Sequence, residues 1–91
     1  MSYIICFWDK SRLQVNNEIG GKLKDAIRAE SIKTFELGLS MYSVSGVEKI
    51  IPKEEAWNIF PADWEILKNM EDRQPNEATL EALGSGQKLF K

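Results

Sequence analysis

The chain has 91 residues, of which 43% are hydrophobic and 29% are charged, and its net charge is −2 at pH 7. This length fits one domain, and this composition is that of a globular protein and excludes a disordered one. Domains that bind nucleic acid through its phosphates usually carry a clustered basic face, which this sequence lacks. We therefore expect a single domain over residues 1–91, and the charge argues against nucleic acid as a partner.

Cys6 is the one cysteine, and the sequence contains no histidine. One cysteine cannot form a disulfide within the chain, so nothing requires an oxidising compartment. Without histidine, the chain lacks the commonest zinc ligand and the commonest general base. The apolar run at residues 3–8 is too short for a membrane span or a signal peptide. We expect a cytoplasmic protein without a membrane partner, in which Cys6 is a buried, unreactive thiol.

The start of the chain is predicted to form a β-hairpin. Residues 3–8 are β-branched and aromatic without a polar interruption, which is typical of a strand covered on both faces. Residues 12–16 alternate instead, with Leu13 and Val15 on one face and polar side chains on the other. This alternation indicates a return strand that has one face in the core.

An amphipathic helix is predicted over residues 18–29, with Asn17 as its N-cap. Its apolar stripe consists of Ile19, Leu23, Ala26 and Ile27. Gly20 and Gly21 each weaken the first turn by about 1 kcal/mol relative to alanine. No phosphate-binding motif surrounds the two glycines. We therefore interpret them as a close approach between helix and sheet, or as a frayed helix start.

The next segment has the period of two that is typical of strands. Its apolar residues fall on odd positions up to Met41 and on even positions from Tyr42. A single strand cannot bury both sets, so we expect either a hairpin of residues 33–37 and 41–44 or a bulge. A further extended segment over residues 47–52 completes this unit. We expect one core built from Leu13, Val15, Ile19, Leu23, Ile27, Phe35 and Leu37.

Short helices are predicted over residues 53–84, followed by a loose end at residues 85–91. The helical part is broken by Pro61 and by a loop at residues 72–75, after which Asn76 caps the last helix. Residues 3–52 thus form a β-hairpin, helix and β-sheet unit, followed by a helical tail. The predicted fold class is α+β, with a small antiparallel sheet (a hairpin, a helix, then a hairpin or three strands) and short C-terminal helices.

The order hairpin, helix and hairpin, followed by Val47-Glu48-Lys49-Ile50-Ile51-Pro52-Lys53-Glu54-Glu55, resembles small proteins encoded by bacteriophages and prophages. The resemblance covers about residues 3–56. It implies an accessory protein that acts by binding, and it assigns no functional residue.

Side chains that could support catalysis have no suitable partners in the sequence. The carboxylates of Asp9, Glu36 and Glu48 are not part of a local pair. The serines between positions 40 and 45 have only Lys49 as a nearby base. We therefore predict no enzymatic activity and no catalytic, cofactor-binding or metal-binding residue.

The densest apolar group consists of Trp57, Ile59, Phe60 and Trp64, which lie within eight residues. These side chains hold the C-terminal helices on the sheet, or some of them form a binding or dimerisation surface, and both can be true of different rings. We name Trp57, Phe60 and Trp64 as candidate partner-binding residues. The favoured function is a non-enzymatic protein-interaction module whose partner is another protein or a second copy of the chain.

The alternative function is binding of single-stranded nucleic acid on the sheet. Bases can stack on aromatic side chains whatever their sequence. The aromatic residues available for such stacking are Tyr3, Phe7, Trp8, Phe35 and Tyr42. The aromatic content favours this alternative, and the net negative charge argues against it.

Overall fold

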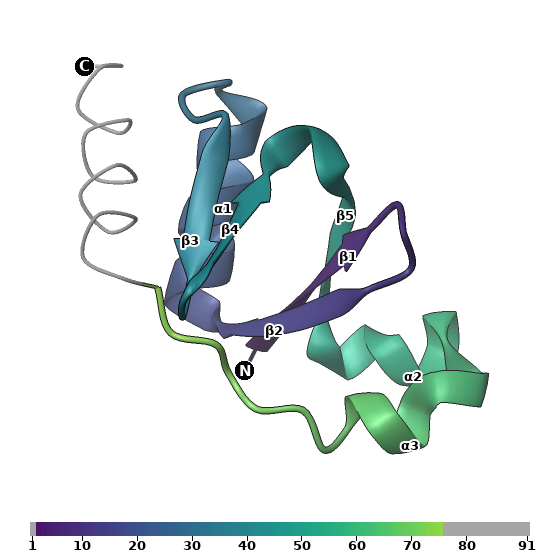
Figure 1. Ribbon diagram of the computed structural model, residues 1–91. Coiled ribbons are helices and arrows are strands. Elements are labelled where there is room, and N and C mark those ends of the chain that lie inside the picture. Colours follow the sequence, from purple (N-terminus) through teal and green to yellow (C-terminus); the bar gives the residue numbers. More distant parts are fainter. Residues whose placement is uncertain (1, 76–91) are drawn as a thin grey trace.

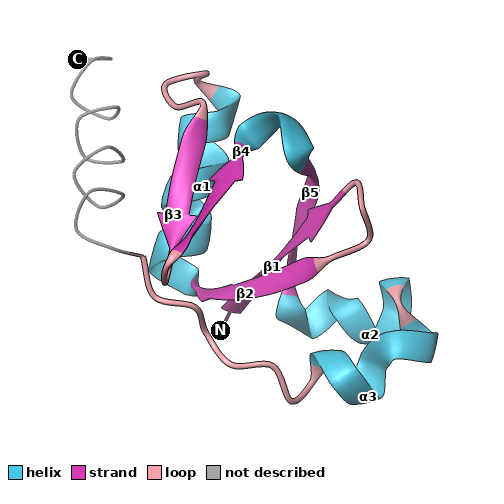
Figure 2. Ribbon diagram, viewed as in Figure 1, coloured by secondary structure: helices cyan, strands magenta, loops and turns pink. Residues whose placement is uncertain are grey.

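The computed structural model describes residues 2–75, which form an α+β fold (Figures 1 and 2). The helices and strands are β1 (Ser2–Phe7), β2 (Arg12–Asn16), α1 (Asn17–Arg28), β3 (Thr34–Leu37), β4 (Ser40–Ser43), β5 (Val47–Pro52), α2 (Ala56–Ile59) and α3 (Trp64–Leu67). Short 3₁₀ turns precede β5, α2 and α3. The predicted α+β class, with antiparallel strands and short C-terminal helices, is confirmed.

The strands form two separate antiparallel sheets. One has three strands in the order β2-β1-β5, and the other is the β3–β4 hairpin. The predicted hairpin is present, and its two strands are joined by a two-residue turn between Leu37 and Ser40. Gly38 in this turn has φ +62°, a left-handed conformation that glycine adopts without steric cost.

The central strand β1 is buried on both faces, as its unbroken apolar run predicts. Ile5 and Phe7 point to one face of the sheet, and Ile4 and Cys6 point to the other. All four side chains are at most 7% exposed. The sheet therefore separates two clusters, which we call the front core and the back core.

The prediction that Trp8 belongs to this strand is wrong. The side chain of Trp8 is 63% exposed and lies in the turn that follows β1. The turn begins at Phe7, whose carbonyl oxygen accepts a hydrogen bond from the Lys10 N–H at 3.0 Å. Lys10 has φ +77°. The polar residues after Trp8 thus form the turn, and strand β1 ends one residue earlier than the apolar run 3–8 predicts.

The front core lies between the three-stranded sheet, helix α1 and the β3–β4 hairpin. Its buried residues are Ile5, Phe7, Val15, Ile19, Leu23, Ala26, Phe35 and Leu37. Leu13 is half-buried against this cluster, in agreement with the prediction. Ile27 departs from the prediction, because it is half-buried and is not a member of the front core. It faces β5 instead.

Helix α1 begins one residue earlier than predicted, and its N-cap is Asn16 and not Asn17. Asn16 has the extended backbone of a strand end, and its Oδ1 accepts a hydrogen bond from the Ile19 N–H at 2.8 Å. This bond pairs one of the free N–H groups of the first helical turn. Either asparagine suits a cap, but only Asn16 lies at the point where β2 ends.

The two glycines of α1 have different surroundings. A Cβ atom placed on Gly20 would lie 2.4–2.8 Å from three atoms of the Tyr3 side chain. A Cβ atom placed on Gly21 would meet nothing within 4 Å. The close approach of helix and sheet is therefore made at Gly20 alone.

The back core lies on the other face of the sheet, under α2 and α3. Its buried residues are Ile4, Cys6, Ile51, Ala56 and Leu67. The predicted short helices after Pro52 are present as α2 and α3, on either side of Pro61. The predicted third helix with its Asn76 cap, and the loose end at residues 85–91, lie outside the described residues. Within residues 2–75, no helix is long and apolar enough to cross a membrane.

The predicted loop at residues 72–75 runs along the outer edge of β2. The Arg73 N–H donates to the Gln14 carbonyl oxygen at 2.6 Å, and the Gln14 Nε2 donates to Asp72 Oδ1 at 2.7 Å. A further bridge joins Pro75 to Leu37 of β3. This segment thereby covers one edge of the three-stranded sheet.

Candidate interaction surface

The three candidate partner-binding residues do not share one environment. Trp57 is 57% exposed. Phe60 and Trp64 are half-buried and pack against the back core. Both interpretations of the aromatic group therefore apply, each to different rings: two rings hold the helices on the sheet, and one faces solvent.

Phe60 is held in place by two cations on the strands. The Arg12 guanidinium lies 4.2 Å from the centroid of its ring, and the Lys49 ammonium lies 5.1 Å from it. Arg12 also pairs with Asp63, since its Nη1 is 2.7 Å from Asp63 Oδ2. These contacts join β2 and β5 to the turn between α2 and α3, so the face of Phe60 is occupied by the protein itself.

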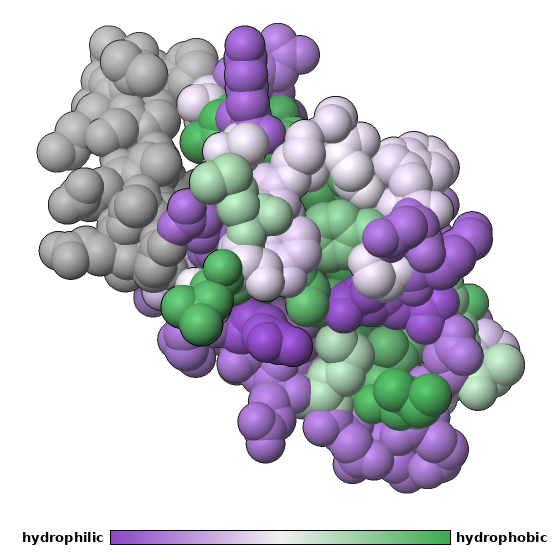
Figure 3. Space-filling view, viewed as in Figure 1, coloured by the Kyte–Doolittle hydropathy of each residue, from purple (hydrophilic) through white to green (hydrophobic). Residues whose placement is uncertain are grey.

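Exposed apolar side chains remain on the outer side of α2 and α3. Ala56 and Leu67 point into the back core, and the residues beside them on each helix, Trp57 and Ile66, turn outward. Ile66 is 71% exposed, and Ile59 at the end of α2 is 39% exposed. We call Trp57, Ile59 and Ile66 the α2–α3 surface. Figure 3 shows apolar side chains exposed in this part of the molecule among hydrophilic ones.

Ile66 was not among the residues chosen from the sequence. The available signal was its position directly before Leu67 on a helix, which places the two side chains about 100° apart. That signal becomes useful only when the buried member of the pair is known. The remaining exposed large hydrophobic side chains of the described chain lie elsewhere, at Trp8, Leu39 and Met41.

Most of the aromatic residues considered for base stacking lie in or against the front core. Phe7 and Phe35 are 7% and 3% exposed. Tyr42 packs against both, with ring centroids 5.2 Å and 5.7 Å away. Tyr3 is half-buried next to Gly20, which leaves Trp8 as the exposed member of the set. The five rings therefore do not form one exposed stacking face.

The side chains of Asp9, Ser43 and Ser45 form hydrogen bonds with residues two positions away. Asp9 accepts hydrogen bonds from the hydroxyl and the backbone N–H of Ser11, and these bonds lower the pKa of its carboxyl group. The hydroxyls of Ser43 and Ser45 contact each other at 2.8 Å. In residues 2–75, no group of three His, Cys, Asp or Glu side chains is placed to hold a metal ion.

Cys6 lies in the back core and is 3% exposed. Burial raises the pKa of its thiol, against a smaller opposing effect of the nearby Arg12 and Lys49 cations. We expect a thiol reagent to label Cys6 at a negligible rate in the native protein and at once after unfolding, because the thiolate is the reactive species. Timed labelling with and without denaturant measures this. Rapid stoichiometric labelling of native protein would show that the thiol is accessible.

Comparison of the chain with protein-family models, with curated proteins and with solved structures found no match. The function is therefore inferred from the residues and contacts described above.

Proposed function

We propose that this domain is a non-enzymatic protein-interaction module, and that the α2–α3 surface binds the partner. The observation that carries the proposal is the exposure of Trp57 at 57% in a segment whose other two aromatic rings are packed. Tryptophan is enriched in the residues that dominate the energy of protein interfaces. Removing a large ring from water is favourable, so a partner that covers Trp57 would gain binding free energy from its apolar surface.

The support under this surface favours binding without rearrangement. Phe60 and Trp64 pack on the back core, and the Arg12–Asp63 ion pair joins the turn between α2 and α3 to β2. Because the backbone under this surface is already fixed, binding costs side-chain entropy there but little backbone entropy. The resemblance to small phage and prophage proteins supports an accessory role that is carried out by binding. A second copy of the chain is the first partner to test, because dimers are the commonest soluble oligomers.

Protein is favoured over nucleic acid as the partner by the placement of the aromatic side chains. Binding of single strands needs several exposed rings along a positively charged groove. Here Phe7, Phe35 and Tyr42 pack together in or against the front core, and the chain carries a net charge of −2.

Replacing Trp57 by alanine tests the proposal. The free energy of unfolding should change by less than about 0.5 kcal/mol, since the side chain is mostly exposed. Association should weaken by about 2 kcal/mol or more if the ring lies at the centre of the interface. Sedimentation over a concentration series measures self-association. If the wild-type protein stays monomeric, wild-type and variant protein are compared in affinity capture from the lysate of a candidate host cell.

Two further variants serve as controls. Trp8→Ala removes a tryptophan of similar exposure outside the surface and should leave association unchanged. Trp64→Ala removes a half-buried ring and should lower the free energy of unfolding by at least about 2 kcal/mol. A partner that Trp57→Ala binds as tightly as the wild type, or a large loss of stability in Trp57→Ala, would contradict the assignment of this surface.

A further inference from the structure

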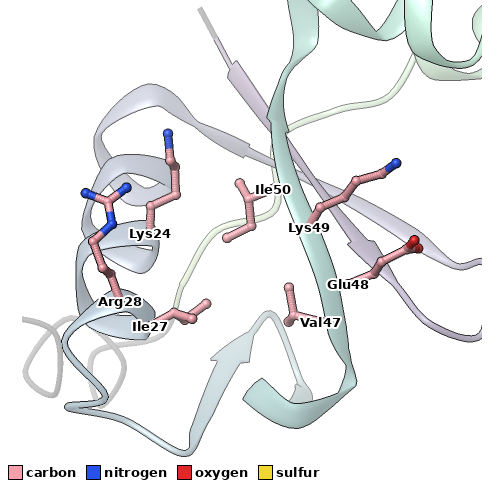
Figure 4. Close-up of a pocket in the computed structure, with 7 residues that line it drawn as sticks. All are labelled: Lys24, Ile27, Arg28, Val47, Glu48, Lys49 and Ile50. Carbon is pink, nitrogen blue, oxygen red and sulfur yellow. The ribbon is translucent and has the colours of Figure 1, made fainter.

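A groove between α1 and β5 combines an apolar floor, a free strand edge and a positively charged wall (Figure 4). Its volume is about 270 Å³. It is lined by Lys24, Ile27, Arg28, Val47, Glu48, Lys49 and Ile50. This groove lies on the front face of the sheet, whereas α2 and α3 pack on the back core.

The floor of the groove is apolar. Ile27 points from the helix toward β5, and Val47 and Ile50 lie opposite it (Figure 4). Val47 and Ile50 pack against the front core and are half-buried. Glu48 and Lys49 point away from the helix (Figure 4). An apolar side chain entering the groove would therefore meet three aliphatic side chains.

The backbone of β5 at Ile50 faces away from the sheet. Backbone groups along an antiparallel strand point alternately to one neighbour and to the other. The Phe7 N–H donates to the Ser11 carbonyl oxygen on the β2 side, so Cys6 turns its groups to Lys49 of β5. Ile50, the next residue along β5, must then turn its N–H and C=O outward.

The two edges of the three-stranded sheet are treated differently. The segment of residues 72–75 covers the outer edge of β2 through the Arg73–Gln14 hydrogen bond and the contacts of Asp72. Within residues 2–75, no strand pairs with the outer edge of β5. An uncovered edge of this kind is a template for pairing with another chain.

The helix wall of the groove carries two positive charges. Lys24 and Arg28 stand one turn apart on α1 (Figure 4). Among the described residues, neither forms an ion pair. The Lys24 ammonium lies 5.0 Å from the centroid of the Tyr3 ring. On a chain with a net charge of −2, this wall is complementary to a carboxylate.

We propose that the groove binds an extended, acidic segment of a partner protein. The segment adds as a strand to the free edge of β5 at Ile50 and places an apolar side chain against Ile27, Val47 and Ile50. A carboxylate of the same segment pairs with Lys24 or Arg28. Backbone pairing of this kind supplies affinity, and the side-chain contacts supply specificity. This site is separate from the α2–α3 surface and does not depend on it.

Selection from a library of displayed short random peptides tests the proposal. Enriched peptides should carry an apolar and an acidic residue two positions apart, because only every second side chain of an added strand faces the groove. Their affinity for the double variant Lys24→Glu/Arg28→Glu should fall by at least about tenfold, equal to about 1.4 kcal/mol. In NMR spectra of the wild-type protein, the Ile50 amide should shift and exchange more slowly when peptide is bound.

The double variant Lys10→Glu/Lys33→Glu is the matched control. It makes the same change of charge at residues outside the groove lining and should bind the selected peptides as the wild type does. Trp57→Ala should also bind them normally, which separates this site from the α2–α3 surface. The proposal is overturned if no acidic peptide is enriched, if the groove variant binds as tightly as the wild type, or if the amide shifts lie at α2 and α3.

Discussion

Replacing Leu23 by alanine is expected to lower the free energy of unfolding by about 2–5 kcal/mol. Leu23 is fully buried in the front core, at 0% exposure, on the stripe of α1 that faces the sheet. Removing its side chain deletes apolar contacts and leaves a cavity that the surrounding residues fill only in part. Leu37→Ala, at 2% exposure on β3, should have an effect in the same range. Small domains are stable by only about 5–15 kcal/mol, so either loss is large.

Denaturant unfolding measures both effects as a shift of the midpoint at an unchanged slope. Ile27→Ala is the matched control on the same helix, because Ile27 is half-buried at the α1–β5 groove and should cost less than Leu23→Ala. A loss below about 0.5 kcal/mol for Leu23→Ala or Leu37→Ala would contradict the assignment of the front core.

Gly20→Ala is expected to destabilise the domain by about 1–3 kcal/mol, although alanine is the better helix former. The new Cβ atom would lie 2.4 Å from Cδ2, 2.7 Å from Cγ and 2.8 Å from Cβ of Tyr3. Rotation of the Tyr3 side chain moves Cδ2 and Cγ but not Cβ, so full relief requires the helix to move away from the sheet. The cost of overpacking therefore outweighs the gain in helix propensity of about 1 kcal/mol.

Gly21→Ala is the control, since its Cβ atom would meet nothing within 4 Å. It should raise the free energy of unfolding by up to about 1 kcal/mol, so the neighbouring substitutions should have opposite signs. In a Tyr3→Ala background, Gly20→Ala should lower the free energy of unfolding by less than it does in the wild type, because the ring atoms of the clash are then absent. Equal effects of the two glycine substitutions would contradict the close approach at Gly20.

Local sequence patterns predicted most of the fold. The order of strands and helices, the turn near Gly38 and the burial of Cys6 all follow from hydrophobic period and turn residues, which act over a few positions. The predictions of the N-cap and of Trp8 were wrong at the ends of a helix and a strand, where neighbouring residues suit the same role. Asn16 and Asn17 are equally good caps, and the position at which β2 ends decides between them.

The candidate site depended on contacts between distant parts of the chain. The sequence indicated Trp57, Phe60 and Trp64 as a group, but not which rings would be packed. Phe60 is covered by Arg12, which lies far from it in sequence and also pairs with Asp63. The groove was missed for the same reason, because it requires Ile27 of α1 to face β5.

The position of β1 at the centre of the sheet governs the order in which a newly synthesised chain can fold. Its pairing with β2 joins residues that are close in sequence. Its other neighbour, β5, lies much later in the chain and ends at Pro52. Until the ribosome has released that segment, β1 keeps one edge unpaired, and Ile4 and Cys6 lack the cover of α2 and α3. Such long-range pairing slows folding, and an open strand edge promotes association between incomplete chains. The nascent chain is therefore most prone to aggregate between completion of the β1–β2 hairpin and arrival of α3.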